Sequence, residues 1–247
     1  MRKIVSIVFS LMLSLGSTAQ TQVVQNRPYT DLRPMHFGVL VGTHAQDLKF
    51  VNAGPQMITD ENGNVVESLV TTDQSSWDVG FNVGVLAEFR LNNYFALRLA
   101  PTLYFGSRQL EFLNHRENDA QGNPIIKKQD LKTVYIATSA DIIYGSKRLN
   151  NVRPYLMAGV SPMLNLSGSS GDIVRLKQFD CMLEVGMGCD FYLPFFKLRP
   201  ELKFCYGLTN ALDTKHHKEI KDKNLLKYTN SVEKANSQMV VLTFYFE

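Results

Sequence analysis

The stretch WDVGFNVGVLAEFRLNNYFALRLAPTLYFGS, residues 77–107, alternates apolar and polar side chains along two arms, with Leu86 as the exception. Alternation at period two is typical of β-strands, because successive side chains point to opposite faces. A short turn with Asn92 and Asn93 joins the arms, which predicts a β-hairpin. Both arms exceed the roughly 5–6 residues of a soluble strand and suit the roughly 9–11 that cross a bilayer at a tilt. The hairpin therefore predicts part of a transmembrane barrel.

Six more segments alternate in the same way, at 35–44, 131–145, 152–164, 179–193, 196–208 and 239–246. The connections between the eight strands alternate in length. Long ones fall at 45–76, 114–130, around 167–171 and at 209–236, and the others are short turns. Outer-membrane barrels have short periplasmic turns and longer external loops. The sequence thus predicts an all-β fold: an eight-stranded antiparallel transmembrane β-barrel of the outer-membrane type, with both termini in the periplasm.

The N-terminus has the pattern of a secretory signal peptide. Arg2 and Lys3 precede an apolar run from Ile4 to Leu15, and small residues follow up to Ala19. This arrangement predicts cleavage after Ala19 and export to the cell outer membrane. An uncleaved N-terminal anchor is the alternative. We therefore expect a signal peptide at 1–19, an irregular periplasmic segment at 20–34 and the barrel at 35–247.

Composition excludes some partners. The formal net charge is +3 and no long run of Lys or Arg occurs, which argues against a nucleic-acid partner. Cys181, Cys189 and Cys205 all lie in predicted strands, and Cys181 and Cys189 are too far apart along one strand to bridge. We expect them to be small apolar fillers.

The polar faces of the strands would line the barrel interior. An eight-stranded barrel is only wide enough for side chains to fill it, and an unpaired buried charge is costly. We therefore expect a plugged lumen, without a wide pore, in which opposite charges pair in a structural network. Its predicted members are Glu88, Arg90, Arg98, Asp141, Arg153, Glu184, Lys197, Arg199 and Glu201.

One sequence pattern supports a membrane barrel and another argues against it. Aromatic residues gather near the strand ends, as the girdles of membrane barrels do, although aromatics also simply favour strands. Four prolines lie inside predicted strands, where proline usually marks an edge or a bulge, and they argue against a smooth barrel: Pro101, Pro154, Pro162 and Pro200.

Signals for catalysis are weak, so we expect a protein that is not an enzyme and has no cofactor. No GxSxG, HExxH or phosphate-binding loop occurs. His216 and His217 are adjacent but lack further metal ligands at a recognisable spacing. An outer-membrane hydrolase or acyltransferase that uses His44 and His115 is the remaining enzymatic alternative.

Four segments resemble the PorT family of outer-membrane proteins. RPYTDLRPMHFGVLVGTHAQDLKF (27–50) is similar to the start of that family, and FALRLAPTLYFG (95–106), VRPYLMAGVSPML (152–164) and FKLRPELKFCYGLTN (196–210) are similar to later strands of this porin-like group. The final VVLTFYFE resembles the aromatic terminal strand, except that Glu247 makes the aromatic residue penultimate. The resemblance implies an outer-membrane barrel without catalytic residues, required for type IX protein secretion or gliding motility.

These inferences leave three functions open. The first is an accessory barrel of the secretion machinery, which sits in outer-membrane lipid and contacts other secretion proteins through 45–76, 209–236 or the periplasmic turns. The second is a general porin-like, ligand-binding or adhesin-like barrel. The third is the enzyme described above.

Overall fold

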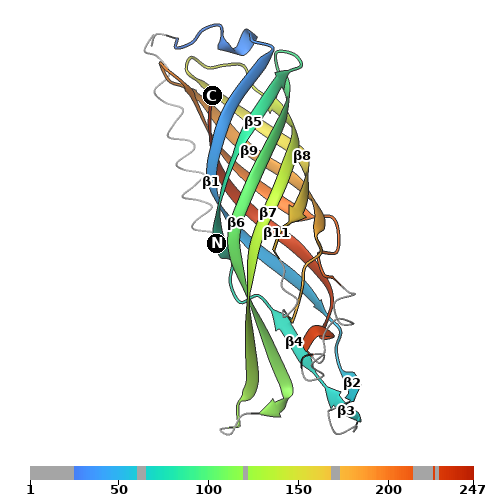
Figure 1. The fold of residues 1–247 in the computed structure, drawn as a ribbon. Helices are drawn as coiled ribbons and strands as arrows, with labels where there is room; N and C mark the ends of the chain where they lie inside the picture. The colour runs from blue at the N-terminus through green and yellow to red at the C-terminus, as the bar shows by residue number, and fades with distance from the viewer. Residues whose placement is uncertain (1–24, 60–64, 119–121, 168–172, 214–224, 226–227) are drawn as a thin grey trace.

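The strands of the computed structural model close into a ring (Figure 1). The structure describes residues 25–59, 65–118, 122–167, 173–213, 225 and 228–247. Eight strands in these ranges form an antiparallel barrel, in which β1 pairs with β11 and β6 pairs with β7 to complete the circle. They are β1 (Met35–Asn52), β5 (Asp78–Arg90), β6 (Phe95–Asn118), β7 (Pro124–Gly145), β8 (Val152–Asn165), β9 (Phe179–Tyr192), β10 (Lys197–Gly207) and β11 (Val232–Phe246). This confirms the predicted fold class.

Alternation explains why the ring closes. Phe37, Val39 and Val41 on β1 face outward and are exposed, whereas Leu40 between them is buried. Leu86, the exception in the opening hairpin, points inward and packs with Leu40 and Tyr245. The apolar outer surface is what a bilayer requires, and ring closure leaves no backbone edge unpaired in the hydrocarbon. The described residues contain no helix long and apolar enough to cross a membrane.

The two ends of the barrel differ as the sequence predicted. Short turns connect β5 to β6, β7 to β8 and β9 to β10 at one end, and the C-terminus lies there too (Figure 1). Residues 25–34 also lie at this end and contain one 3-10 helix, η1 (Thr30–Leu32). The signal peptide predicted at 1–19 lies outside the described residues. We call this the short-turn end and the opposite end the long-loop end.

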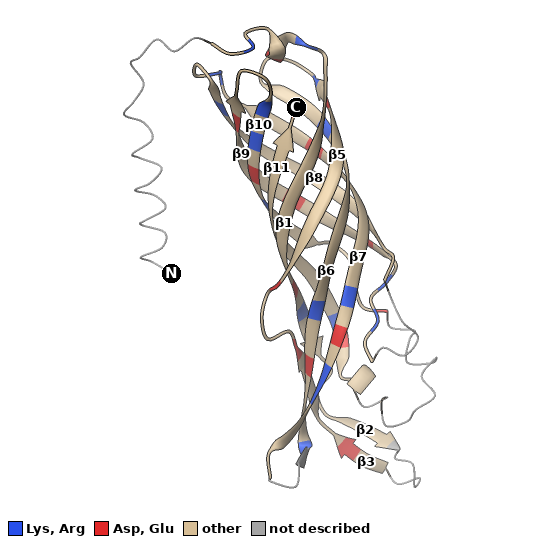
Figure 2. Cartoon of the chain, turned by 60° about the vertical axis from the view of Figure 1, so that its left-hand side comes forward, with Lys and Arg blue, Asp and Glu red and all other residues tan. Residues whose placement is uncertain are grey.

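The prediction of a loop at 114–130 was wrong. β6 and β7 are 24 and 22 residues long and stay paired, from Phe95 with Tyr144 as far as Asn114 with Ile125. The two strands leave the barrel as a projecting arm, and charged residues recur along this arm (Figure 2). The charges in this region belong to strands that continue into water, so a charged segment between two apolar strands need not be a loop.

Parts of the other predicted long loops are also strands. β1 extends to Asn52 and β11 begins at Val232, so their pairing runs far past the predicted strand ends. Between β1 and β5 lie the hairpin β2 (Gln56–Thr59) and β3 (Val65–Ser68), and β4 (Val70–Asp73), which pairs with β6.

The strands reverse their polarity beyond the lipid-facing band. On β6, Leu103 faces outward within this band, but in the extension Gln109 faces outward while Leu110 and Phe112 point inward and are fully buried. These inward residues belong to an apolar core at the long-loop end, formed by Leu48, Val70, Leu110, Phe112, Leu131, Ile173, Val174, Leu176, Ala211, Leu212, Tyr228, Val232 and Ala235. An apolar interior with a polar surface is the arrangement of a water-soluble domain.

Three of the four strand prolines mark neither edges nor bulges, so that expectation was wrong for them, whereas Pro154 lies just past the last β7–β8 pair, Gly145 with Tyr155. At Pro101 the β5–β6 ladder stops after Gly84–Thr102 and resumes at Ala87–Leu99 in the same register. The β7–β8 ladder is interrupted in the same way at Pro162, and the β9–β10 ladder at Pro200. Each of these prolines remains paired with the neighbouring strand on its other side. The barrel therefore accommodates each proline by losing part of one ladder without changing register.

Candidate functional site

Arg98 of β6 joins three strands across the lumen. Its guanidinium lies 2.9 Å from an Asp141 carboxylate oxygen on β7 and 2.8 Å from a Glu201 oxygen on β10. The Tyr155 and Tyr245 hydroxyls also donate to Glu201, at 2.7 and 2.9 Å. The side chains of the ion-paired groups are fully buried. Asp141 lies opposite Arg98 on the neighbouring strand, whereas the bond from Arg98 to Glu201 crosses the interior, so the cluster fills this section of the lumen.

A second cluster lies closer to the short-turn end and centres on Arg199 of β10. The Arg199 guanidinium bonds to the carboxylates of Glu88 and Asp190, at 2.5 Å for the Nε bond to Asp190. Lys197 pairs with Glu247, the terminal residue. Glu247, the departure from the aromatic terminus of the resembled family, thus supplies a carboxylate to the lumen.

A third cluster contains Lys203 and Glu184, which form an ion pair at 3.0 Å, and Ser139 donates to Glu184 at 3.3 Å. Lys203 alternates with Glu201 on the inner face of β10, so strand alternation places it in the lumen as well. Three buried cations and one buried anion thus lie on a single strand, β10. Their ion-pair partners lie on β5, β6 and β9 and at Glu247. The lumen contains dense polar contacts across its width.

The structure brings seven of the nine predicted lumen residues into these ion pairs, and they are Glu88, Arg98, Asp141, Glu184, Lys197, Arg199 and Glu201. The other two, Arg90 and Arg153, lie at the short-turn mouth. Arg90 donates to the Leu32 carbonyl at 3.1 Å and to the Asn93 side chain. Arg153 donates to the Ser146 and Asn93 carbonyls, both at 2.9 Å.

Residues 25–34 fold over the same mouth. The Asn26 amide donates to the Asn151 side chain at 2.8 Å, and the Tyr192 hydroxyl donates to the Asp31 carboxylate at 2.6 Å. Arg148 donates to the Asn26 and Arg27 carbonyls and stacks on the Tyr192 ring, 3.6 Å from its centre. Sequence reasoning missed this contact, because an irregular polar segment has no periodicity from which its position can be predicted.

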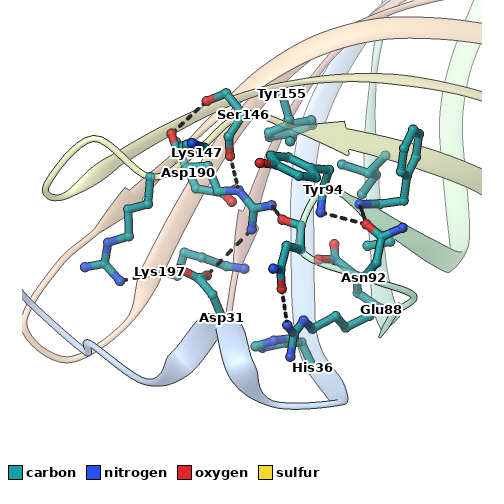
Figure 3. A pocket seen from close by; sticks show the side chains of 18 of the residues that line it. Asp31, His36, Glu88, Asn92, Tyr94, Ser146, Lys147, Tyr155, Asp190 and Lys197 are labelled. Atoms are coloured by element: carbon teal, nitrogen blue, oxygen red, sulfur yellow. Dashed lines mark hydrogen bonds and ion pairs between the residues drawn. The ribbon is translucent and has the colours of Figure 1, made fainter.

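A cavity of about 350 Å³ lies between residues 25–34 and the turns. Figure 3 shows Asp31 of the N-terminal segment, Asn92 and Tyr94 of the β5–β6 turn and Ser146 of the β7–β8 turn around it. Glu88 and Asp190 of the barrel interior also line it. Its volume is within the range of small-ligand sites. The cavity is therefore a candidate binding site.

Arg108 is a buried cation that sequence reasoning did not single out. It is fully buried on β6, and within the described part of the chain its guanidinium nitrogens have no hydrogen-bond partner. It lies 5.8 Å from the centre of the Tyr135 ring. The alternation of β6 did place Arg108 on the inner face, between Gly106 and Leu110. It lies between the ion pairs and the apolar core.

The histidines of the enzymatic alternative lie in different environments. His44 is buried inside the barrel against Tyr104, with no hydrogen bond to its ring nitrogens among the described residues. His115 lies on the exposed arm and bonds to Thr71 at 2.9 Å. His216 and His217 lie outside the described residues. The described residues contain no group of three or more side chains that could hold a metal ion.

Comparison with protein families identifies the class. Residues 19–213 match the model of the outer membrane protein beta-barrel domain. This match covers most of the chain, so the protein belongs to that family. Membership places the protein in the outer membrane, with the short turns facing the periplasm by the general rule for such barrels.

Three solved structures are similar in fold. Neisserial surface protein A is 14% identical, with a TM-score of 0.43, covering 86% of this chain and 98% of that one. OprG of Pseudomonas aeruginosa is 12% identical, with a TM-score of 0.46 and coverages of 85% and 93%. Ail, the attachment invasion locus protein of Yersinia pestis, solved with a heparin analogue, is 15% identical, with a TM-score of 0.37 and coverages of 87% and 100%. Comparison with curated proteins found no match.

Proposed function

We propose that the protein is a non-catalytic, non-conducting barrel that serves as an accessory component of type IX protein secretion. The observation that carries this proposal is the lumen, where Arg98, Arg199 and Lys203 each bond to buried carboxylates of other strands. A solute would have to break several charge-assisted bonds to pass, and each such bond is stronger than an ordinary one. The barrel then acts through its two ends.

The secretion role draws its support from sequence. Residues 27–50, which resemble the PorT family, include part of the segment that folds over the periplasmic mouth. Arg27 and Asp31 belong to this part. Partner contacts in this role fall on the periplasmic turns or on the predicted regions 45–76 and 209–236. A non-catalytic role agrees with the separate surroundings of His44 and His115.

A deletion strain tests this proposal. We expect loss of secreted protease or of gliding, with normal uptake of small solutes, and restoration by the wild-type gene. Purified protein in a planar bilayer should show no unitary conductance. Normal export together with altered permeability in the deletion strain would contradict the secretion role and favour a porin.

One observation favours an adhesin-like barrel as a second candidate. The hairpin β2–β3 and the β6–β7 arm extend beyond the lipid-facing band and expose apolar side chains there, including Met57, Val65 and Ile126. Exposed apolar residues far from lipid suit contact with another macromolecule. Binding of intact cells to host or surface ligands, lost when the arm is shortened and with export intact, would support this candidate.

A further inference from the structure

Two arginines at the periplasmic mouth are held in place without a carboxylate in hydrogen-bonding contact. Arg90 binds the Leu32 carbonyl and the Asn93 side chain, and Arg153 binds the carbonyls of Asn93 and Ser146. Both guanidinium groups therefore contact the same residue, Asn93. Among the described residues, the only carboxylate within 4 Å of either is Asp31, 3.8 Å from Arg153.

The carboxylates near the two arginines have other partners. Glu88 and Asp190 bond to Arg199. Asp31 accepts the Tyr192 hydroxyl bond and lies 3.6 Å from Arg148 as well. The lining of the mouth cavity includes six cationic side chains and three carboxylates, which are Arg90, Lys147, Arg148, Arg153, Lys197 and Arg199 against Asp31, Glu88 and Asp190. Glu247, which is outside this lining, pairs with Lys197, and an excess of positive charge remains after this carboxylate is counted.

The turn that holds these arginines is ordered by its own hydrogen bonds. The Asn92 side chain accepts bonds from the backbone amides of Tyr94 and Phe95, each at 2.8 Å. Gly145 leaves room for Arg153, because a β-carbon there would lie 2.7 Å from the guanidinium. Groups that are already positioned lose little freedom when a ligand binds. Each guanidinium also has more N–H donors than its present bonds use.

We propose that Arg90 and Arg153 form an anion site that binds the carboxylates of an acidic polypeptide segment in the periplasm. Guanidinium groups match carboxylates with paired hydrogen bonds, and their charge persists at any physiological pH. The cavity opens between the N-terminal segment and the turns, with Lys147 at its edge (Figure 3). The identification of the ligand as a polypeptide rests on the proposed role in protein secretion.

The test is peptide binding to the full mature chain in phosphatidylcholine nanodiscs. The probe is a fluorescein-labelled hexaglutamate peptide, with hexaglutamine as the neutral control. We expect hexaglutamate alone to bind, and Arg90→Gln/Arg153→Gln to weaken its affinity about tenfold or more, because two charge-assisted contacts are lost. The matched control is Lys128→Gln/Lys132→Gln, which removes the same charge from the opposite end and should change affinity less than about twofold.

Three results would overturn the proposal. The first is equal binding of hexaglutamate to the wild type and to a folded Arg90→Gln/Arg153→Gln variant. If that variant fails to fold, the Arg90→Lys/Arg153→Lys variant replaces it. An affinity for hexaglutamate equal to that of the wild type would then overturn the proposal that guanidinium groups bind the carboxylates with paired hydrogen bonds. The second is binding of hexaglutamine as strong as that of hexaglutamate.

The third is displacement of hexaglutamate from phosphatidylcholine nanodiscs by soluble glycerophosphoglycerol at a lower concentration than by unlabelled hexaglutamate, which would make a lipid phosphate the ligand. These outcomes are separate from the test of secretion. A deletion strain that exports normally would contradict the secretion role even if hexaglutamate binds. Conversely, if hexaglutamate fails to bind, an export defect in the deletion strain would still support the secretion role.

Discussion

Replacing Arg98 with methionine should destabilise the barrel strongly. The Asp141 carboxylate receives its described hydrogen bonds from Arg98 alone, at 3.1 Å from Nε and 2.9 Å from Nη2. Glu201 would keep its bonds from the Tyr155 and Tyr245 hydroxyls. Removal of one partner of a buried ion pair costs about 3–5 kcal/mol, because the remaining charge is buried without compensation. We therefore expect Arg98→Met to lower the free energy of unfolding by about that amount, mainly through Asp141.

The assay is guanidinium unfolding of the refolded protein in detergent micelles. Trp77 is the single tryptophan of the chain and lies next to the start of β5, so its fluorescence reports on the barrel. The double variant Arg98→Met/Asp141→Asn should recover part of the loss, with a coupling of about 1 kcal/mol or more. Lys132→Met is the control, because Lys132 is exposed and should contribute less than about 0.5 kcal/mol.

A loss below about 1 kcal/mol for Arg98→Met would refute the reasoning. Such a value is typical of ion pairs that water can reach. It would mean that the lumen is wet at Arg98, and the argument for a non-conducting barrel would fail with it.

Three further predictions follow from other buried or anchoring contacts. Arg108→Met should be neutral or stabilise the barrel by about 1 kcal/mol in the same unfolding assay, because no described hydrogen-bond partner of Arg108 loses a bond. Gly188→Val should cost about 2 kcal/mol, because a β-carbon there would lie 2.3 Å from the Tyr155 hydroxyl and displace it from Glu201. Arg148→Ala should speed proteolysis of residues 25–34 without unfolding the barrel, as gel mobility before and after heating would show, since Arg148 bonds to Asn26 and Arg27.

The sequence was sufficient to predict the eight strands and their facing but not their ends. Period-two alternation predicted β6 as far as Ser107, where the lipid-facing band ends. Beyond it the alternation persists with reversed polarity, so that Leu110 and Phe112 point inward while Gln109 faces water. Apolar residues face outward where the barrel contacts lipid and inward where it contacts water. The strand pattern therefore cannot be interpreted without knowing where the bilayer ends.

The lumen was predictable as a set of residues but not as a set of pairs. Strand alternation places Arg98 and Glu201 on inner faces, yet 103 residues separate them, and their contact depends on how the ring closes and tilts. Arg90 and Arg153 share that polarity, but they lie near strand ends. Arg90 binds a carbonyl of the N-terminal segment, and Arg153 binds carbonyls of the turns. The register of a strand therefore predicts which face a side chain occupies, whereas its partner depends on its depth in the barrel.

Depth also separates the parts of the barrel that can respond to a partner from those that cannot. Rearrangement of the middle section would break the bonds of Arg98 and Arg199 with their buried carboxylates, at a cost comparable to the whole stability of a small domain. The periplasmic mouth differs, because Arg90 and Arg153 hold backbone carbonyls and an asparagine and keep donors free for a ligand. The extracellular extension has an apolar core of its own. Arg199 and its partners border the mouth cavity, but Arg98, Asp141 and Glu201 do not line it, so binding at either end can proceed without disturbing the Arg98 ion pairs.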